Sequence, residues 1–172
     1  KRPKTEVREL MRLLRSFLET PLAELHENRI RLNAIGELNR LPPVIQRKLN
    51  RVIKETASYN NGVLTLALSY GGRAEIVAAA REIATQVHDG RLNLDDINEE
   101  TFSRCLYTHD IPDPDLLIRT AAEMRLSNFL LWQVSYSELW VTPTLWPDFN
   151  EETLRHAVQD YSRRVRRFGE IK

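Results

Sequence analysis

Apolar residues recur along this chain with two different periods. Spacings of three and four produce an apolar stripe in residues 4–18 and a second one in residues 44–57, which predicts two amphipathic helices. Alternation over residues 29–35 predicts a strand, and the nearly continuous apolar run 63–68 predicts another that is covered on both faces. Helices therefore alternate with strands in the first part of the chain.

The alternation continues in the second part of the chain. The expected elements are a helix over 74–88, a short helix capped by Asn98, a strand over 116–118, a short buried helix over 128–133, a strand over 139–142, and a last helix capped by Asn150 with Leu154, Ala157, Val158, Tyr161 and Val165 as its inner stripe. This order predicts an α/β fold, in which a mostly parallel sheet is flanked by helices on both faces. No repeat or linker interrupts the pattern, so we expect residues 1–172 to form a single domain.

Composition excludes several classes of protein. The 172 residues are 42% hydrophobic, which is enough for a core, and the net charge of +1 offers no field for nucleic acid or an anionic membrane. No apolar run reaches the ~18 residues of a membrane span, and no signal peptide is visible. The single Cys105 fits a reducing compartment, where we expect it to be a small buried or half-buried hydrophobe. We therefore expect a cytoplasmic protein.

The densest group of candidate ligands follows the strand at 116–118. Arg119 and Thr120 end that strand, and Arg125 and Ser127 come shortly after. The planar fork of arginine binds phosphate oxygens bidentately, and hydroxyl groups occupy further acceptor positions. Ligand crevices form at the carboxyl ends of strands in open α/β sheets. The pattern indicates a diphosphate site, although an ordinary charged loop would contain the same residue types.

Longer motifs make the chain resemble the cis-prenyltransferases, the undecaprenyl diphosphate synthase family, from end to end. Residues 69–73 resemble the family's Y-G-G-R motif, and residues 119–133 resemble R-T-G-G-E-x-R-x-S-N-F-L-L-W-Q. Y-S-E-L at 136–139 and L-W-P-D-F at 145–149 follow in the family's order, and Arg2 with the next proline resembles the end of E-N-W-x-R-P. The resemblance implies an undecaprenyl diphosphate synthase-like fold.

The resemblance also implies ligands for two diphosphates and one metal ion. The expected ligands are Arg119, Arg125 and Ser127 for isopentenyl diphosphate, Arg2 for the allylic diphosphate, Glu138 for Mg²⁺, and Arg167, from an R-x-G ending, across a dimer interface. A single carboxylate is a normal share of a Mg²⁺ site, because the ion keeps waters and binds substrate phosphates. In the family an Asp from an upstream loop of H-x-M-D-G-N-G-R-W character completes the site. We therefore expect residues 1–172 to be the later part of a longer protein and to be inactive alone.

The implied activity is Mg²⁺-dependent condensation of isopentenyl diphosphate with an allylic diphosphate, with release of pyrophosphate and formation of Z double bonds. The expected product is undecaprenyl diphosphate, a cell-wall lipid carrier that a homodimer at the inner membrane surface would deliver to the membrane. A non-catalytic phosphate-binding partner subunit of the same fold is the alternative. The presence of Arg119, Arg125, Ser127 and Glu138 argues against this alternative, because a subunit that only binds a partner would not need all four. A nucleotide-binding regulator would need a Gly-rich phosphate motif that the chain lacks.

Several residues allow two interpretations. Glu123 could orient the arginines, which we favour, or contact substrate, and Asn128 could cap the short helix, which we favour, or fix the loop. Gly71 and Gly72 could cradle phosphate at a helix N-terminus or make a tight turn. The stripes of the first two helices could be core or could line a tunnel for the growing product.

Ala121-Ala122 replaces the two glycines that the family usually has, and four histidines show no metal spacing: His26, His88, His109 and His156. If the two alanine positions need positive φ, alanine costs about 1–2 kcal/mol at each, whereas at negative φ it would stiffen the loop. We expect the loop to work.

Overall fold

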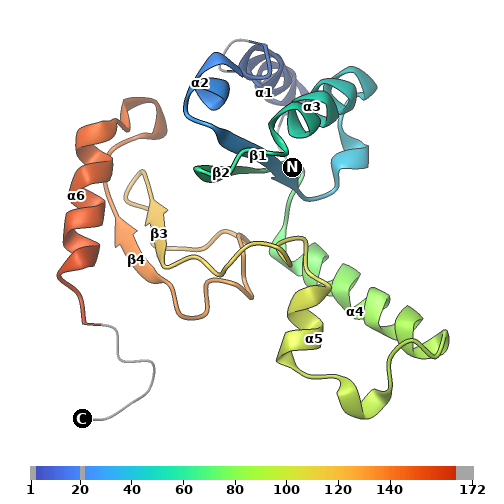
Figure 1. Ribbon diagram of the computed structural model, residues 1–172. Coiled ribbons are helices and arrows are strands. Elements are labelled where there is room, and N and C mark those ends of the chain that lie inside the picture. The colour runs from blue at the N-terminus through green and yellow to red at the C-terminus, as the bar shows by residue number, and fades with distance from the viewer. Residues whose placement is uncertain (1–2, 20–21, 166–172) are drawn as a thin grey trace. The chain divides into compact units, whose positions relative to one another are not determined.

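Both pairs of strands in the described part of the chain are parallel. The computed structural model describes residues 3–19 and 22–165, and the chain divides into two compact units, Lys1–Tyr70 and Gly71–Lys172. In the first unit β1 (Ile30–Ile35) pairs with β2 (Gly62–Ala67), and in the second β3 (Leu116–Arg119) pairs with β4 (Glu138–Val141) (Figure 1). Helices flank these strands, which confirms the predicted α/β class. The prediction of a single domain stays a prediction.

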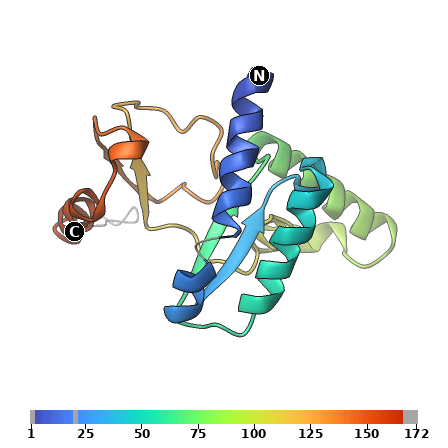
Figure 2. The ribbon, with the colours of Figure 1, turned by 90° about the horizontal axis from the view of Figure 1, so that it is seen from above.

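In the first unit, three helices pack on the strand pair and on one another. They are α1 (Lys4–Phe17), α2 (Leu22–Glu27) and α3 (Pro43–Thr56), which lie over one face of β1 and β2 (Figures 1 and 2). Their buried core consists of Leu18, Leu25, Leu32, Leu41, Ile45, Leu49 and Val52. The predicted periodicities are thus confirmed, because the residues at three- and four-residue spacing supply much of this core.

The burial of β2 differs from the prediction. Val63 and Leu64 are 47% and 37% exposed, so among the described residues this strand is not covered on both faces.

At the end of α3, Thr56 links the helix to β1. Its hydroxyl accepts the Leu32 N–H at 3.0 Å and donates to the Val52 carbonyl at 2.9 Å. That fully buried hydroxyl fixes β1 against α3.

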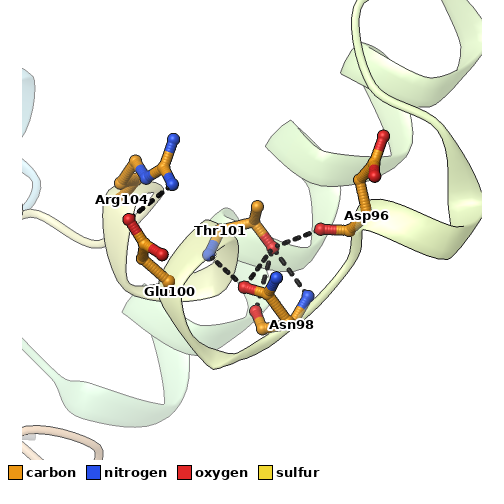
Figure 3. Close-up of polar contacts among 5 residues, drawn as sticks. All are labelled: Asp96, Asn98, Glu100, Thr101 and Arg104. Carbon is orange, nitrogen blue, oxygen red and sulfur yellow. Dashed lines mark hydrogen bonds and ion pairs between the residues drawn. The ribbon is translucent and has the colours of Figure 1, made fainter.

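The second unit contains α4 (Gly72–His88), α5 (Glu99–Arg104) and α6 (Glu151–Ser162). Both predicted caps are confirmed. Asn98 Oδ1 accepts the Thr101 N–H at 3.0 Å while Thr101 Oγ1 accepts the Asn98 N–H at 2.8 Å, which completes a capping box (Figure 3). Asn150 Oδ1 accepts the Thr153 N–H at 3.0 Å at the start of α6. Short 3₁₀ turns occur at Leu38–Arg40 in the first unit and at Leu94–Asp96 and Trp146–Asp148 in the second.

Two expectations for this unit are wrong. Residues 128–133 form turns and not a helix, because Asn128 and Leu130 have φ of 64° and 46°, outside the helical region. Of the expected inner stripe of α6, Ala157 is fully buried, but Leu154 and Val158 are 45% and 50% exposed among the described residues.

No helix in the described part of the chain is long and apolar enough to cross a membrane.

Candidate diphosphate and metal sites

Three of the predicted diphosphate ligands lie together at the end of β3 and in the loop that follows it. Arg119 Nη2 donates to Ser127 Oγ at 3.4 Å, a long hydrogen bond. Glu123 forms an ion pair with Arg119 and another, at 2.5 Å, with Arg125. The carboxylate therefore lies between the two guanidinium groups, and this arrangement favours the orienting role for Glu123. We call Arg119, Glu123, Arg125 and Ser127 the clamp.

A pocket of about 260 Å³ borders the clamp. Its polar lining comes from Arg119, Thr120 and Arg125, and its apolar lining consists of Leu117, Ile118, Leu126, Phe129 and Trp146. The side chain of Arg125 is 66% exposed, whereas that of Arg119 is only 30% exposed. The Nε of Arg119 is buried and has no hydrogen-bond acceptor among the described residues. Cationic donors beside an apolar lining suit a ligand with a phosphate group and a hydrocarbon part.

The two alanines of the clamp loop both have positive φ, 62° for Ala121 and 53° for Ala122. Their N–H groups donate to the carbonyls of Thr144 and Thr142 at 3.0 and 2.8 Å. The first of the two possibilities for this departure from glycine therefore applies, and alanine stores strain of about 1–2 kcal/mol at each position. The alternative, a loop stiffened at negative φ, is wrong. The hydrogen bonds to residues 142 and 144 hold the strained conformation.

Glu138 does not join the clamp in this structure. The parallel register pairs Leu116 with Glu138 and Arg119 with Val141, so Glu138 and Arg119 lie at opposite ends of the strand pair. Three residues of strand separate these positions by roughly 10 Å. Instead, Arg164, just after α6, donates from Nη1 to Glu138 Oε2 at 2.9 Å. Sequence reasoning missed this arginine.

Glu138 offers one free carboxylate oxygen among the described residues. Among the described residues, Oε1 of Glu138 receives no hydrogen bond, and no group of three or more His, Cys, Asp or Glu gathers as a metal site. A hard carboxylate oxygen suits Mg²⁺, which takes one or two protein carboxylates and fills its octahedron with waters and phosphate oxygens. Glu138 therefore fits as one ligand.

The N-terminus of α4 is closed by Asn128. The Asn128 carbonyl accepts the Gly72 N–H at 2.8 Å, and its Oδ1 accepts the Arg73 N–H at 2.9 Å. These donors are the ones that a phosphate would use, so the interpretation of Gly71 and Gly72 as a phosphate cradle is not supported. The favoured role for Asn128, capping a short helix at its own position, is therefore wrong, because residues 128–133 form no helix; Asn128 instead caps α4.

Cys105 is partly buried, and burial raises the pKa of its thiol above the ordinary value, which fits a hydrophobe better than a nucleophile. His26 lies beside the Tyr59 hydroxyl at 2.8 Å, and His109 pairs with Asp110 at 3.1 Å. Arg2 and Arg167 lie outside the described residues.

The fold and the clamp identify a class of protein. A family model described as putative undecaprenyl diphosphate synthase matches residues 1–169, and the chain belongs to this family. The isoprenyl transferase of Heliobacterium mobile is 50% identical over 172 residues, which are 100% of this chain and 66% of that protein. The isoprenyl transferase of Bacillus subtilis is 47% identical over 171 residues, 99% of this chain and 66% of that protein. The chain thus spans about two thirds of the length of these curated relatives.

Two solved structures are similar to this chain. Lavandulyl diphosphate synthase from Lavandula x intermedia, in complex with dimethylallyl diphosphate, superposes with a TM-score of 0.96 at 44% identity, covering 99% of this chain and 74% of that one. A probable undecaprenyl diphosphate synthase from Campylobacter jejuni gives a TM-score of 0.84 at 35% identity, covering 98% of this chain and 77% of that one.

Proposed function

We propose that the complete protein is a Mg²⁺-dependent cis-prenyltransferase that joins isopentenyl diphosphate to an allylic diphosphate. The observation that carries the proposal is the clamp, in which Arg119 and Arg125 share the Glu123 carboxylate and Arg119 also donates to Ser127, beside a partly apolar pocket. Membership of the family supports it. So does the solved relative that binds dimethylallyl diphosphate, itself an allylic diphosphate.

In this proposal the clamp binds the diphosphate of isopentenyl diphosphate. Arg119 and Arg125 form charge-assisted hydrogen bonds to its oxygens, and the Ser127 hydroxyl donates to another. Glu123 keeps the two guanidinium groups in place, because it pairs with both. The apolar lining of the pocket, Phe129 included, takes the hydrocarbon part and excludes water from it.

Glu138 would hold the metal ion through its open Oε1. When bound, Mg²⁺ neutralises negative charge on the leaving pyrophosphate. Arg2 would contact the allylic diphosphate, and Arg167 would act across a homodimer interface.

The apolar stripe of α1 would supply wall for a product tunnel. Met11, Leu14 and Phe17 pack against the core of the first unit, whereas Val7 and Leu10 are 42% and 40% exposed. An apolar face of this kind can receive a hydrocarbon chain, and each CH₂ removed from water is worth about 0.8 kcal/mol. The proposed product is undecaprenyl diphosphate, and the proposed location is the cytoplasm, at the inner membrane surface.

Incorporation of labelled isopentenyl diphosphate into longer chains tests the proposal. The complete protein should give product with Mg²⁺ and none with EDTA, and Glu138→Gln should remove most of the turnover. The matched control is Glu151→Gln, because Glu151 pairs with Arg155 on exposed helix surface and should leave turnover unchanged. Unchanged turnover in Glu138→Gln would contradict the metal assignment. Binding of isopentenyl diphosphate without any product would instead support the non-catalytic partner subunit.

A further inference from the structure

Asn128 connects the clamp to α4, a helix that is far from it in the sequence. The first N–H groups of any helix have no acceptor inside the helix. In α4 the N-cap residue is Gly71, which has no side chain that could supply an acceptor. Asn128 provides two acceptors, its carbonyl for the Gly72 N–H at 2.8 Å and its Oδ1 for the Arg73 N–H at 2.9 Å, although it is 55 positions away from Arg73 in the sequence. The helix terminus and the clamp loop thus hold each other.

The glycines at the start of α4 permit this close contact. A Cβ at Gly71 would lie 2.8 Å from the Asn128 Nδ2, and a Cβ at Gly72 would lie 2.9 Å from the Leu131 Cγ. Further into the helix, Gln133 Nε2 donates to the buried Glu75 Oε2 at 3.2 Å. The segment 128–133 is therefore attached to the first turn of α4 at several successive points.

This attachment determines the position of Ser127. Ser127 and Asn128 have φ of 50° and 64°. Asparagine tolerates this left-handed backbone, but serine rarely adopts it unless its surroundings fix it. The hydrogen bonds of Asn128 to α4 provide that fixation directly beside Ser127. Because Ser127 Oγ accepts from Arg119 Nη2, the contacts run without interruption from α4 through Asn128 and Ser127 to the clamp.

We propose that Asn128 is a positioning residue for the diphosphate site, acting through Ser127 and not by contact with substrate. The inference rests on the proposed function, since it assigns Asn128 to the assembly of the same clamp. It joins residues 71–73 of one signature motif to residues 128–133 of the other. Gly71 and Gly72 leave room for the loop after β3 to approach α4 closely. In this proposal the diphosphate of isopentenyl diphosphate binds at the clamp and not at these glycines.

The test compares Asn128→Ala with Asn128→Asp in the complete protein. The alanine variant loses the Oδ1 acceptor, so we expect the KM for isopentenyl diphosphate to rise about tenfold while kcat stays within about threefold. Aspartate keeps an acceptor and suits a helix N-terminus, so it should restore the KM to near the original value. Asn150→Ala is the matched control, because Asn150 caps α6 with one side-chain oxygen at 3.0 Å. It should lower the Tm without changing the KM.

Other outcomes overturn the inference. An unchanged KM in Asn128→Ala, an equal rise in Asn150→Ala, or no recovery in Asn128→Asp would show that Asn128 is only a stabilising cap. Calorimetric titration with inorganic pyrophosphate separates this failure from failure of the proposed function. If the complete protein makes no product, Asn128→Ala must still weaken pyrophosphate binding about tenfold relative to Asn150→Ala. Equal binding by the two variants would overturn the positioning role.

Discussion

Arg164 and Glu138 form an ion pair that joins the end of α6 to the start of β4, with 2.9 Å between Nη1 and Oε2. The same guanidinium donates to the Leu139 carbonyl at 3.0 Å and to Asp160 Oδ2 at 2.5 and 3.1 Å. Hydrogen bonds with Glu138 and then Asp160 raise the pKa of Arg164 above its ordinary value. Among the described residues Glu138 is thus held by one oxygen, Oε2, and in the proposed metal site its other oxygen would bind the cation.

Arg164→Met should weaken metal binding. Partners that orient a ligating carboxylate typically contribute 10–100-fold to metal affinity, so we expect Mn²⁺ to bind the complete protein about tenfold more weakly. Electron paramagnetic resonance of free Mn²⁺ measures this without turnover. The Mn²⁺ affinity of Arg164→Lys should lie between those of the unchanged protein and Arg164→Met. Arg163→Met is the matched control and should bind Mn²⁺ as the unchanged protein does. Tighter binding in Arg164→Met would show that the guanidinium competes with the metal instead.

Glycine at Ala121 or Ala122 should stabilise the protein. Both residues have positive φ, 62° and 53°, where alanine but not glycine is strained, so each substitution should raise the free energy of unfolding by about 1 kcal/mol. Urea denaturation measures the change. Ala84→Gly, on the exposed side of α4, should have the opposite sign, a loss of about 1 kcal/mol. A loss in all three variants would contradict the strain assigned to the loop.

Glu123→Gln should impair binding of isopentenyl diphosphate. The carboxylate pairs with both Arg119 and Arg125, and a neutral amide would release the two guanidinium groups from their shared partner. We expect the KM for isopentenyl diphosphate to rise about fivefold to tenfold, a loss of about 1–1.4 kcal/mol, with kcat changed much less. Steady-state kinetics at saturating Mg²⁺ decides the point. A lower KM would mean that Glu123 competes with the diphosphate for the arginines.

Cys105 should react slowly with iodoacetamide. Burial, followed by the nearby Glu82 carboxylate, raises the pKa of the thiol, so at pH 8 less of it is the reactive thiolate than for an ordinary cysteine. The rate of alkylation, followed by mass spectrometry, should therefore keep rising with pH beyond the point where the urea-unfolded protein levels off. Because the chain has one cysteine, the unfolded protein is its own control. Coinciding pH profiles would contradict the assignment.

Local signals in the sequence predicted most of the elements. The apolar stripes of α1 and α3 and the caps at Asn98 and Asn150 depend on residues three or four positions apart, which a sequence displays directly. The grouping of Arg119, Arg125 and Ser127 was also predictable, because Arg119 ends one strand and the other two follow in the next loop. Short-range patterns of this kind are independent of the rest of the fold.

Contacts between distant segments were not predictable in this way. Asn128 and α4 are partners only in the folded chain, and the same contacts give residues 128–133 a backbone that a helix cannot have. Arg164 is one arginine in a basic run, and nothing near it in the sequence indicates Glu138. The wrong helix and the missed arginine have one cause, since both depend on hydrogen bonds between residues far apart in the sequence.

The buried pair of Glu75 and Gln133 limits which sequences this fold can accept. Glu75, 1% exposed, accepts the Tyr107 N–H at 2.9 Å and the Gln133 amide at 3.2 Å, and the same amide donates to Thr108 at 2.9 Å. Glutamate at position 133 would set two carboxyl groups against each other in the interior, and an apolar residue there would remove a hydrogen-bond donor from the buried Glu75 carboxyl group. Related sequences should therefore change positions 75 and 133 together or not at all.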